Sequence, residues 1–149
     1  RLTEEGRNHP MYEGKASVFD GFISHDDHIT ELPPGAQCLA TNDFTKVQAV
    51  SVEYLNGTFW ATQYHPEYNL YEMARLIMAR EDKLLNQGFF ETHEDLIQYV
   101  DKMETIYRNP ERKDFRWQLA IDKDLISESI VQCEFVNWLN MVISTSDEA

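Results

Sequence analysis

The chain has 149 residues, of which 42% are hydrophobic and 12% aromatic. This composition supports one buried core and is typical of a folded, soluble protein rather than a disordered one. The 26 acidic and 13 basic side chains give a formal net charge of -13, which argues against a nucleic-acid partner because binding to phosphates requires an excess of Lys and Arg. The apolar runs are far shorter than the roughly 20 residues that cross a bilayer, so no membrane partner is expected.

The two cysteines and six glycines of the chain bear on its cellular compartment and on whether it binds a cofactor. Cys38 and Cys133 do not form a Cys-rich framework, a pattern typical of a reducing compartment, and we expect a cytoplasmic protein. No Gly-rich nucleotide-binding loop occurs, so no cofactor is expected. The chain begins at Arg1 without a methionine, and we expect further residues to precede it in a parent protein.

The first part of the chain is predicted to form short strands separated by turns. Residues 18–24 are a compact apolar and aromatic run, and residues 36–40 are a second one. Between them, Leu32-Pro33-Pro34-Gly35 is typical of a turn. We therefore expect a strand at each of the two apolar runs.

A hairpin is the clearest local prediction. Residues 47–55 and 58–64 are joined by Asn56-Gly57, a pair suited to a two-residue turn because both central positions require positive φ. The second arm is bulky on both faces, as expected for a strand that is covered on both sides and lies deep in a sheet. Pro66 follows it directly, so we expect a helix to begin at residues 65–67.

The second part of the chain is predicted to be helical. Thr92 can cap a helix that ends at Asn109-Pro110. The apolar residues at helical spacing along it are Leu96, Val100, Met103 and Tyr107.

A last helix is expected over residues 124–143, followed by a loose polar end at 144–149. Phe135, Trp138 and Val142 share one face of it. We expect this face to pack on the first part of the chain. As a hypothesis, it could instead dock a partner or a second copy in a homodimer.

His65 and Glu67 stand where the hairpin's second arm ends. In extended chain, residues two apart point to the same side, so the carboxylate can accept the imidazole N–H and fix its tautomer. The other ring nitrogen is then a base, and a base oriented by a carboxylate is two-thirds of a nucleophilic triad. The alternative is that Glu67 simply occupies the first turn of the expected helix, where a negative charge suits the helix dipole.

The surrounding residues resemble one enzyme family. Residues 57–67, Gly-Thr-Phe-Trp-Ala-Thr-Gln-Tyr-His-Pro-Glu, resemble the closing motif of class I glutamine amidotransferases, in which a strand ends in Gln, an aromatic residue and then His-Pro-Glu. Upstream segments follow the same family's order and spacing, namely residues 2–3, 9–12, 22–27 and 32–36. The resemblance covers roughly residues 2–80, and the combination is specific.

The resemblance implies an α/β fold, a three-layer sandwich with a mainly parallel mixed sheet. Residues 1–80 would be the C-terminal half of the amidotransferase domain, and residues 81–149 a helical C-terminal extension. The segment that begins at Ser24 looks closest to the glutaminase part of GMP synthetases.

The family's reaction, as the resemblance implies it, is glutamine hydrolysis by a Cys-His-Glu triad, which releases ammonia and leaves a glutamyl thioester for water to cleave. His65 and Glu67 match the base and the orienting acid. Ser24, His25 and Asp26 match the segment that contacts the α-amino and α-carboxylate groups of bound glutamine.

The family's nucleophile does not match any residue of the chain. It sits in a Gly-x-Cys-x-Gly turn, and neither Cys38 nor Cys133 has flanking glycines, so both are expected to be packed core thiols. The chain alone is then expected to be inactive. Its partners would be an N-terminal portion of the same domain that carries the cysteine, and a synthetase domain or subunit that takes up the ammonia.

Three alternatives remain from the sequence. His25-Asp26-Asp27-His28, with His65, invites a metal site, although His25 and His28 would point to opposite faces of an extended chain, and we expect no metal. The second alternative is a non-catalytic scaffold or regulatory relative whose parent lacks the cysteine. The third is a hydrolase of the same superfamily that cleaves γ-glutamyl amides of other amines.

Overall fold

The computed structural model describes residues 1–147, with the backbone alone for residues 145–147. The chain divides into two compact units, one formed by Arg1–Glu67 with the segment from Ser129 onward, and the other by Tyr68–Glu128. The first unit contains α1 (Glu4–Asn8), the 3₁₀ helix η1 (Pro10–Tyr12), β1 (Ala36–Ala40), β2 (Ala49–Tyr54), β3 (Gly57–Thr62) and α7 (Cys133–Asp147). The second contains α2 (Leu70–Ala79), α3 (Glu81–Asn86), α4 (His93–Arg108), α5 (Lys113–Gln118) and the 3₁₀ helix η2 (Lys123–Leu125), while the short α6 (Glu128–Val131) follows at the boundary. No helix within the described residues is long and apolar enough to span a membrane.

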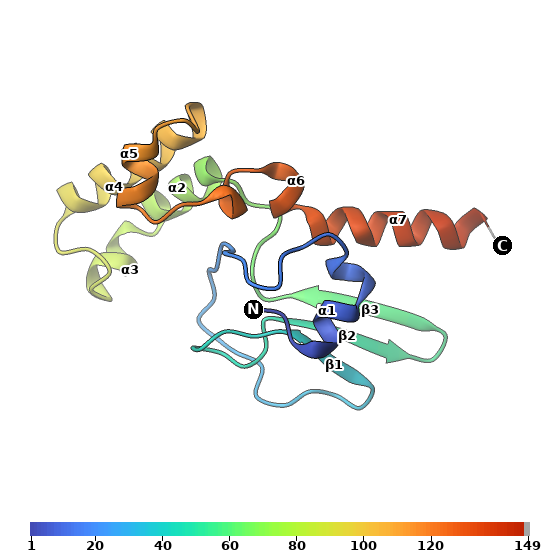
Figure 1. Ribbon diagram of the computed structural model, residues 1–149. Coiled ribbons are helices and arrows are strands. Elements are labelled where there is room, and N and C mark those ends of the chain that lie inside the picture. The colour runs from blue at the N-terminus through green and yellow to red at the C-terminus, as the bar shows by residue number, and fades with distance from the viewer. Residues whose placement is uncertain (148–149) are drawn as a thin grey trace. The chain divides into compact units, whose positions relative to one another are not determined.

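The three strands form one antiparallel sheet in the order β1-β2-β3 (Figure 1). This sheet, together with the helices, confirms the α/β class, while the larger parallel sheet stays a prediction. The second arm of the predicted hairpin, which is β3, was expected to lie deep in a sheet, and this prediction is wrong for the described residues. It lies at the sheet edge, and Phe59 on it is 63% exposed.

The predicted hairpin joins β2 and β3, but its turn lies one residue earlier than expected. Tyr54 pairs with Gly57, so the two central residues are Leu55 and Asn56. Leu55 has a φ of 53°, a left-handed conformation that costs a side-chain-bearing residue roughly 1–2 kcal/mol. The glycine of the Asn-Gly pair instead opens β3 and does not relieve this strain.

Replacing Leu55 by glycine is expected to stabilise the fold by about 1 kcal/mol, because glycine adopts positive φ without steric cost. The Leu55 side chain is 87% exposed, so little packing is lost. The midpoint and slope of urea unfolding give the change. Leu55→Ala, which keeps the strain, is the control, and an equal gain from alanine would show that exposure rather than φ is responsible.

The strand predicted over residues 18–24 is wrong. The segment is a loop without a regular ladder, in which the Phe22 carbonyl accepts a hydrogen bond from the His65 N–H at 2.8 Å. An apolar run becomes a strand only where a neighbouring strand can pair with it. The predicted turn is confirmed, because Ala36 N–H donates to the Pro33 carbonyl at 3.1 Å and Gly35 has a φ of 81°, as the third position of a type II turn requires.

Helix α1 lies against β1, and Gly6 permits the approach (Figure 1). Thr3 caps the helix, and its hydroxyl also donates to the Cys38 carbonyl at 2.7 Å. A Cβ atom on Gly6 would lie 1.9 Å from the Leu39 carbonyl oxygen. The core around this contact is formed by Leu2, Met11, Tyr12, Leu39, Ala40, Ala49 and Tyr64.

Gly6→Ala is therefore expected to destabilise the chain by about 2–3 kcal/mol, the cost of forcing a methyl group into a packed backbone contact. Gly57→Ala is a matched control, since its Cβ would come no closer than 3.8 Å to the Tyr54 carbonyl oxygen, and its effect should stay within about 0.5 kcal/mol. Guanidinium unfolding of both variants measures the difference. Equal losses of stability in the two variants would contradict the close contact between Gly6 and the Leu39 carbonyl.

The second unit is built on α2 and α4, which pack together. The Thr92 cap is confirmed, with Asp95 completing a capping box. The predicted stripe is corrected at one position, since Ile106 is buried and Tyr107 is exposed. Helix α2 begins at Leu70 rather than at residues 65–67, because Asn69 and Glu72 form its capping box.

The single last helix predicted over residues 124–143 is instead broken into η2, α6 and α7. At the break between α6 and α7, the Lys15 ammonium donates to the Ile130 carbonyl at 2.5 Å, an acceptor that a continuous helix would pair with the N–H of residue 134. The loose end predicted at 144–149 is wrong for residues 144–147, which belong to α7. Residues 148–149 lie outside the described residues.

Helix α7 packs on the first part of the chain, but not through the predicted face. Among the described side chains of the helix, Glu134 is the buried one, whereas Phe135, Trp138 and Val142 are 53%, 40% and 38% exposed. The Asn137 amide donates to the carbonyls of Met11 and Glu13 at 3.0 and 2.9 Å. Phe135 and Trp138 line a groove of about 250 Å³ next to β3 and stay partly exposed. Homodimer formation through this face stays a prediction, which light scattering of the intact chain would test.

Candidate functional site

The candidate site lies where the chain leaves β3. Gln63 N–H donates to the Gln48 carbonyl at 2.8 Å, and His65 N–H donates to the Phe22 carbonyl at 2.8 Å. Between them Tyr64 is buried, and the backbone bends at Gln63 and Tyr64. The strand ladder therefore ends at Thr62, and these two backbone hydrogen bonds hold the chain up to the turn at Pro66 and Glu67.

The predicted contact between His65 and Glu67 is present. Nδ1 of His65 lies 2.8 Å from Oε1 of Glu67, and the two side chains are 28% and 61% exposed. A carboxylate only accepts hydrogen bonds, so Nδ1 carries the proton and Nε2 is the basic nitrogen. The alternative role of Glu67 in the first turn of a helix is wrong, because α2 begins three residues later.

The predicted substrate-binding segment lies in the loop held against His65. Ser24 and His25 follow Phe22, whose carbonyl binds the His65 N–H, and both are half-buried, whereas Asp26 is exposed. Nδ1 of His25 donates to the Asp27 carbonyl at 2.8 Å. The loop therefore comes to the same strand end as the His65–Glu67 pair, while the binding roles of its residues stay predictions.

A buried polar network behind the site was not predicted from the sequence. The Tyr64 hydroxyl donates to Oε1 of Glu134 at 2.5 Å and lies 2.8 Å from the Tyr12 hydroxyl. Lys15 Nζ lies 3.0 Å from Oε1 of the same carboxylate, and the Lys15 and Glu134 side chains are 3% and 2% exposed. Burial raises the pKa of both tyrosines well above the usual range. The one available signal was a glutamate, Glu134, directly before the apolar residues Phe135 and Val136 of this helix.

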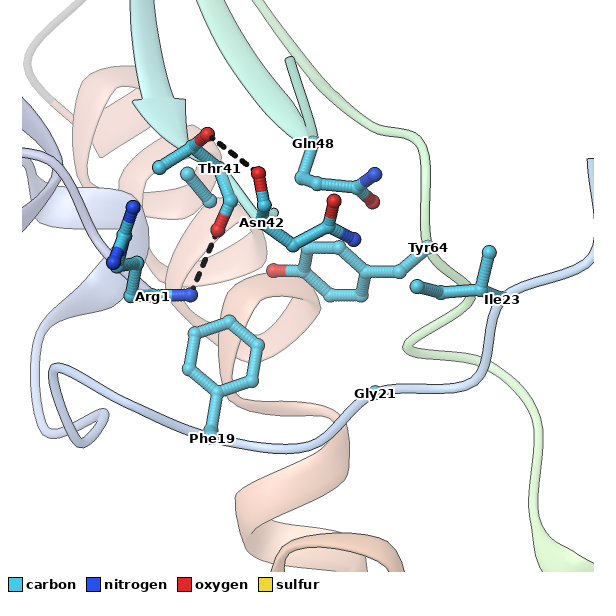
Figure 2. Close-up of a pocket in the computed structure, with 9 residues that line it drawn as sticks. Arg1, Phe19, Gly21, Ile23, Thr41, Asn42, Gln48 and Tyr64 are labelled. Carbon is cyan, nitrogen blue, oxygen red and sulfur yellow. Dashed lines mark hydrogen bonds between the residues drawn. The ribbon is translucent and has the colours of Figure 1, made fainter. Parts of the chain in front are cut away.

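Tyr64 also forms a wall of a small cavity of about 50 Å³ (Figure 2). Figure 2 shows its ring among Phe19, Asn42 and Gln48, with Ile23 of the loop nearby. The Phe19 and Tyr64 rings meet edge to face with centroids 5.6 Å apart. Tyr64 is thus held both by its ring and by its hydroxyl.

Both cysteines are half-buried rather than packed in the core, and both are free thiols. Cys38 lies in β1, where its thiol donates to the Ala40 carbonyl at 3.4 Å, and the thiol of Cys133 donates to the Glu13 carbonyl at 3.2 Å. Burial raises the pKa of each thiol, which disfavours the thiolate that a nucleophile requires. These environments support the expectation that neither is the nucleophile.

The metal alternative finds no support in the geometry. Among the side chains that the structure describes, those of residues 1–144, no group of three or more His, Cys, Asp and Glu residues is arranged to hold a metal ion. The four residues 25–28 lie on an irregular loop, where the Nδ1 atom of His25 is taken up by a backbone carbonyl.

An imidazole oriented by a carboxylate at a strand end, within an α/β unit, is the arrangement of a base in nucleophilic hydrolases and transferases. The family model described as glutamine amidotransferase class-I matches residues 1–83, more than half of the chain. The chain belongs to the class I glutamine amidotransferase family, which confirms the resemblance seen in the sequence.

Curated relatives are similar over the same region. The chain is 38% identical over 91 residues to a γ-glutamyl-L-1-hydroxyisopropylamide hydrolase of a Pseudomonas species, which covers 61% of the chain and 30% of that protein. It is 33% identical over 67 residues to one subunit of the glutamine-hydrolysing GMP synthase of Ignicoccus hospitalis, covering 45% of the chain and 35% of that protein. With the GMP synthase of Thermomicrobium roseum it shares 35% identity over 66 residues, or 44% of the chain and 12% of that protein.

The chain thus spans about a third or less of the length of these relatives. No solved structure matches it.

Proposed function

We propose that this chain supplies the base and the orienting acid of an enzyme that hydrolyses the side-chain amide of glutamine. The 2.8 Å contact between His65 Nδ1 and Glu67 Oε1 is the observation that carries the proposal. Family membership supports it, since residues 1–83 match the amidotransferase class. The acid fixes the tautomer, and the base acts through Nε2.

In the proposed reaction, a cysteine from outside these 149 residues gives its proton to Nε2 of His65, and the thiolate attacks the glutamine carboxamide carbon. The C–N bond breaks, the protonated imidazole returns the proton to the leaving nitrogen, and ammonia departs. Water then cleaves the thioester to glutamate, with the same imidazole taking up and returning a proton. Ser24, His25 and Asp26 would contact the α-amino and α-carboxylate groups of the substrate.

The remaining parts of the proposal concern the whole protein. Residues 1–80 would complete a three-layer domain with a mainly parallel sheet, whose first strands and cysteine lie in an N-terminal portion, and residues 81–149 would be its helical extension. The similarity to one subunit of a GMP synthase favours a partner that is a synthetase, either a domain of the same protein or a separate subunit. The unpaired thiols favour action in the cytoplasm.

A second candidate is hydrolysis of γ-glutamyl amides of other amines. It is favoured by the 38% identity to a γ-glutamyl-L-1-hydroxyisopropylamide hydrolase. The same base and acid would serve, because the scissile bond is again a γ-glutamyl carboxamide and only the leaving amine differs.

The experiment is to assay the whole protein with glutamine and with γ-glutamyl alkylamides, measuring glutamate and the released amine. An electrophilic glutamine analogue that alkylates active-site thiols, followed by peptide mass spectrometry, would locate the cysteine. Faster turnover of glutamine supports the first candidate, and faster turnover of an alkylamide the second. Absence of both turnover and alkylation would remove both candidates and leave the non-catalytic relative.

A further inference from the structure

The buried carboxylate of Glu134 binds the side chain of Tyr64, the residue before His65. Its Oε1 accepts the Tyr64 hydroxyl at 2.5 Å and lies 3.0 Å from Lys15 Nζ. Its Oε2 accepts a second hydrogen bond from the same ammonium at 3.1 Å. The carboxylate is therefore fixed between one cation and one hydroxyl, and both of its oxygens are used.

This carboxylate comes from α7, a helix outside the residues 1–83 that the family model matches. Lys15 itself is held at the start of that helix, because its ammonium also donates to the Ile130 carbonyl at 2.5 Å and lies 4.6 Å from the centre of the Phe19 ring. The helix and the loop after η1 are thus joined through buried charge. A charge pair removed from water to this degree persists only with such full coordination.

Tyr64 connects the fixed Glu134 carboxylate to the candidate site, because it is the residue next to His65. Its buried side chain is held at the hydroxyl by Glu134 and Tyr12, and the N–H of the next residue, His65, is held by the Phe22 carbonyl. Because Tyr64 and His65 are adjacent, fixing the Tyr64 side chain and the His65 N–H restrains the backbone from which the His65 imidazole projects. A shift of the backbone here would change the 2.8 Å contact with Glu67.

We propose that Glu134 is a positioning residue for the His65–Glu67 pair, acting through the Tyr64 hydroxyl. A catalytic effect of this role rests on the proposed function. The contact of Glu134 with Tyr64, and its effect on the position of His65, can be tested in this chain alone. Helix α7 thereby becomes part of the site's support.

The test measures hydrogen exchange of the His65 Nδ1 proton in the full chain by ¹⁵N-histidine NMR, with the signal assigned by its loss in His65→Gln. Tyr64→Phe removes only the linking hydroxyl and keeps the Lys15–Glu134 ion pair. It is expected to speed exchange about 10-fold, and Glu134→Gln should do the same. Tyr12→Phe is the matched control, since it removes a hydroxyl from the same network without breaking the Tyr64–Glu134 bond, and it should change exchange less than about 2-fold.

The double variant Tyr64→Phe/Glu134→Gln separates positioning from general loosening. If Glu134 acts through Tyr64, the double variant exchanges no faster than Tyr64→Phe alone, because the link is already cut. Unchanged exchange in Tyr64→Phe, equal acceleration in Tyr12→Phe, or a further acceleration in the double variant would each overturn the proposal. Should Glu134→Gln fail to fold, the comparison of Tyr64→Phe with Tyr12→Phe decides alone.

Kinetics of the whole protein supply the catalytic readout. Tyr64→Phe should lower kcat about 10-fold with little change in KM, since a misdirected base affects the chemical step rather than substrate binding. A raised KM with unchanged kcat would contradict positioning. If no γ-glutamyl amide is turned over at all, the proposed function fails, while the exchange measurement still decides the link between Glu134 and His65.

Discussion

Turnover of the preferred γ-glutamyl substrate is expected to fall on the order of 10⁵-fold when His65 is replaced by alanine in the whole protein, because no other group would take the thiol proton. Nε2 is the atom that the geometry makes basic, since Nδ1 donates to Glu67 at 2.8 Å. Substrate binding should change little, so the loss should appear in kcat. Steady-state release of glutamate measures it.

The fold should tolerate this substitution, which makes the kinetic result interpretable. The contact of His65 with Glu67 is solvent-exposed, with Glu67 at 61% exposure, and exposed ion pairs contribute about 0–1 kcal/mol. A melting temperature close to that of the parent is the control. Near-normal turnover in a folded His65→Ala protein would remove the assignment of the base.

Glu67→Gln is expected to cost less, on the order of 10³- to 10⁴-fold, because the imidazole is misoriented rather than lost. The glutamine amide is nearly the same size as the carboxylate, but it can present either a donor or an acceptor to Nδ1 and therefore no longer selects one tautomer. A loss as large as that of His65→Ala would indicate that Glu67 also contacts the reacting groups.

The elements that the sequence predicted are those whose signals are local. The turn at residues 32–35, the Thr92 cap and the β2–β3 hairpin each follow from a few adjacent residues. The contact of His65 with Glu67 is equally local, because only Pro66 separates the two residues, although the contact forms at a turn rather than in the extended chain that the sequence predicted. The hairpin turn moved by one residue because strand pairing, rather than the preference of Asn-Gly, set the register.

The features that the sequence missed depend on partners far along the chain. Residues 18–24 have the composition of a strand but find only scattered backbone bonds, such as that between Phe22 and His65. The last helix breaks where Lys15, more than a hundred residues earlier, binds the Ile130 carbonyl. Helical periodicity carries no information about such a distant cation, so the Lys15–Glu134 pair and its contact with Tyr64 could not be derived from it.

The Lys15–Glu134 pair is expected to show the largest stability effect in the chain. Glu134→Leu leaves the Lys15 ammonium buried without its counter-charge, and removing one partner of a buried ion pair costs about 3–5 kcal/mol. It also leaves the Tyr64 hydroxyl with Tyr12 as its remaining partner in the network. Urea unfolding of the intact chain, followed by near-ultraviolet circular dichroism, measures the loss.

The double variant Lys15→Met/Glu134→Leu removes both charges and keeps much of the apolar volume, so most of the lost stability should return. Its recovery separates the cost of an unpaired charge from the cost of lost packing, because packing alone would make the two single losses add. Additive losses in the double variant would show that the pair is not coupled as its 3.0 Å distance indicates. Recovered stability together with a fast-exchanging His65 Nδ1 proton would show that the charge pair is dispensable for folding, whereas the Glu134 contact with Tyr64 is required to position the site.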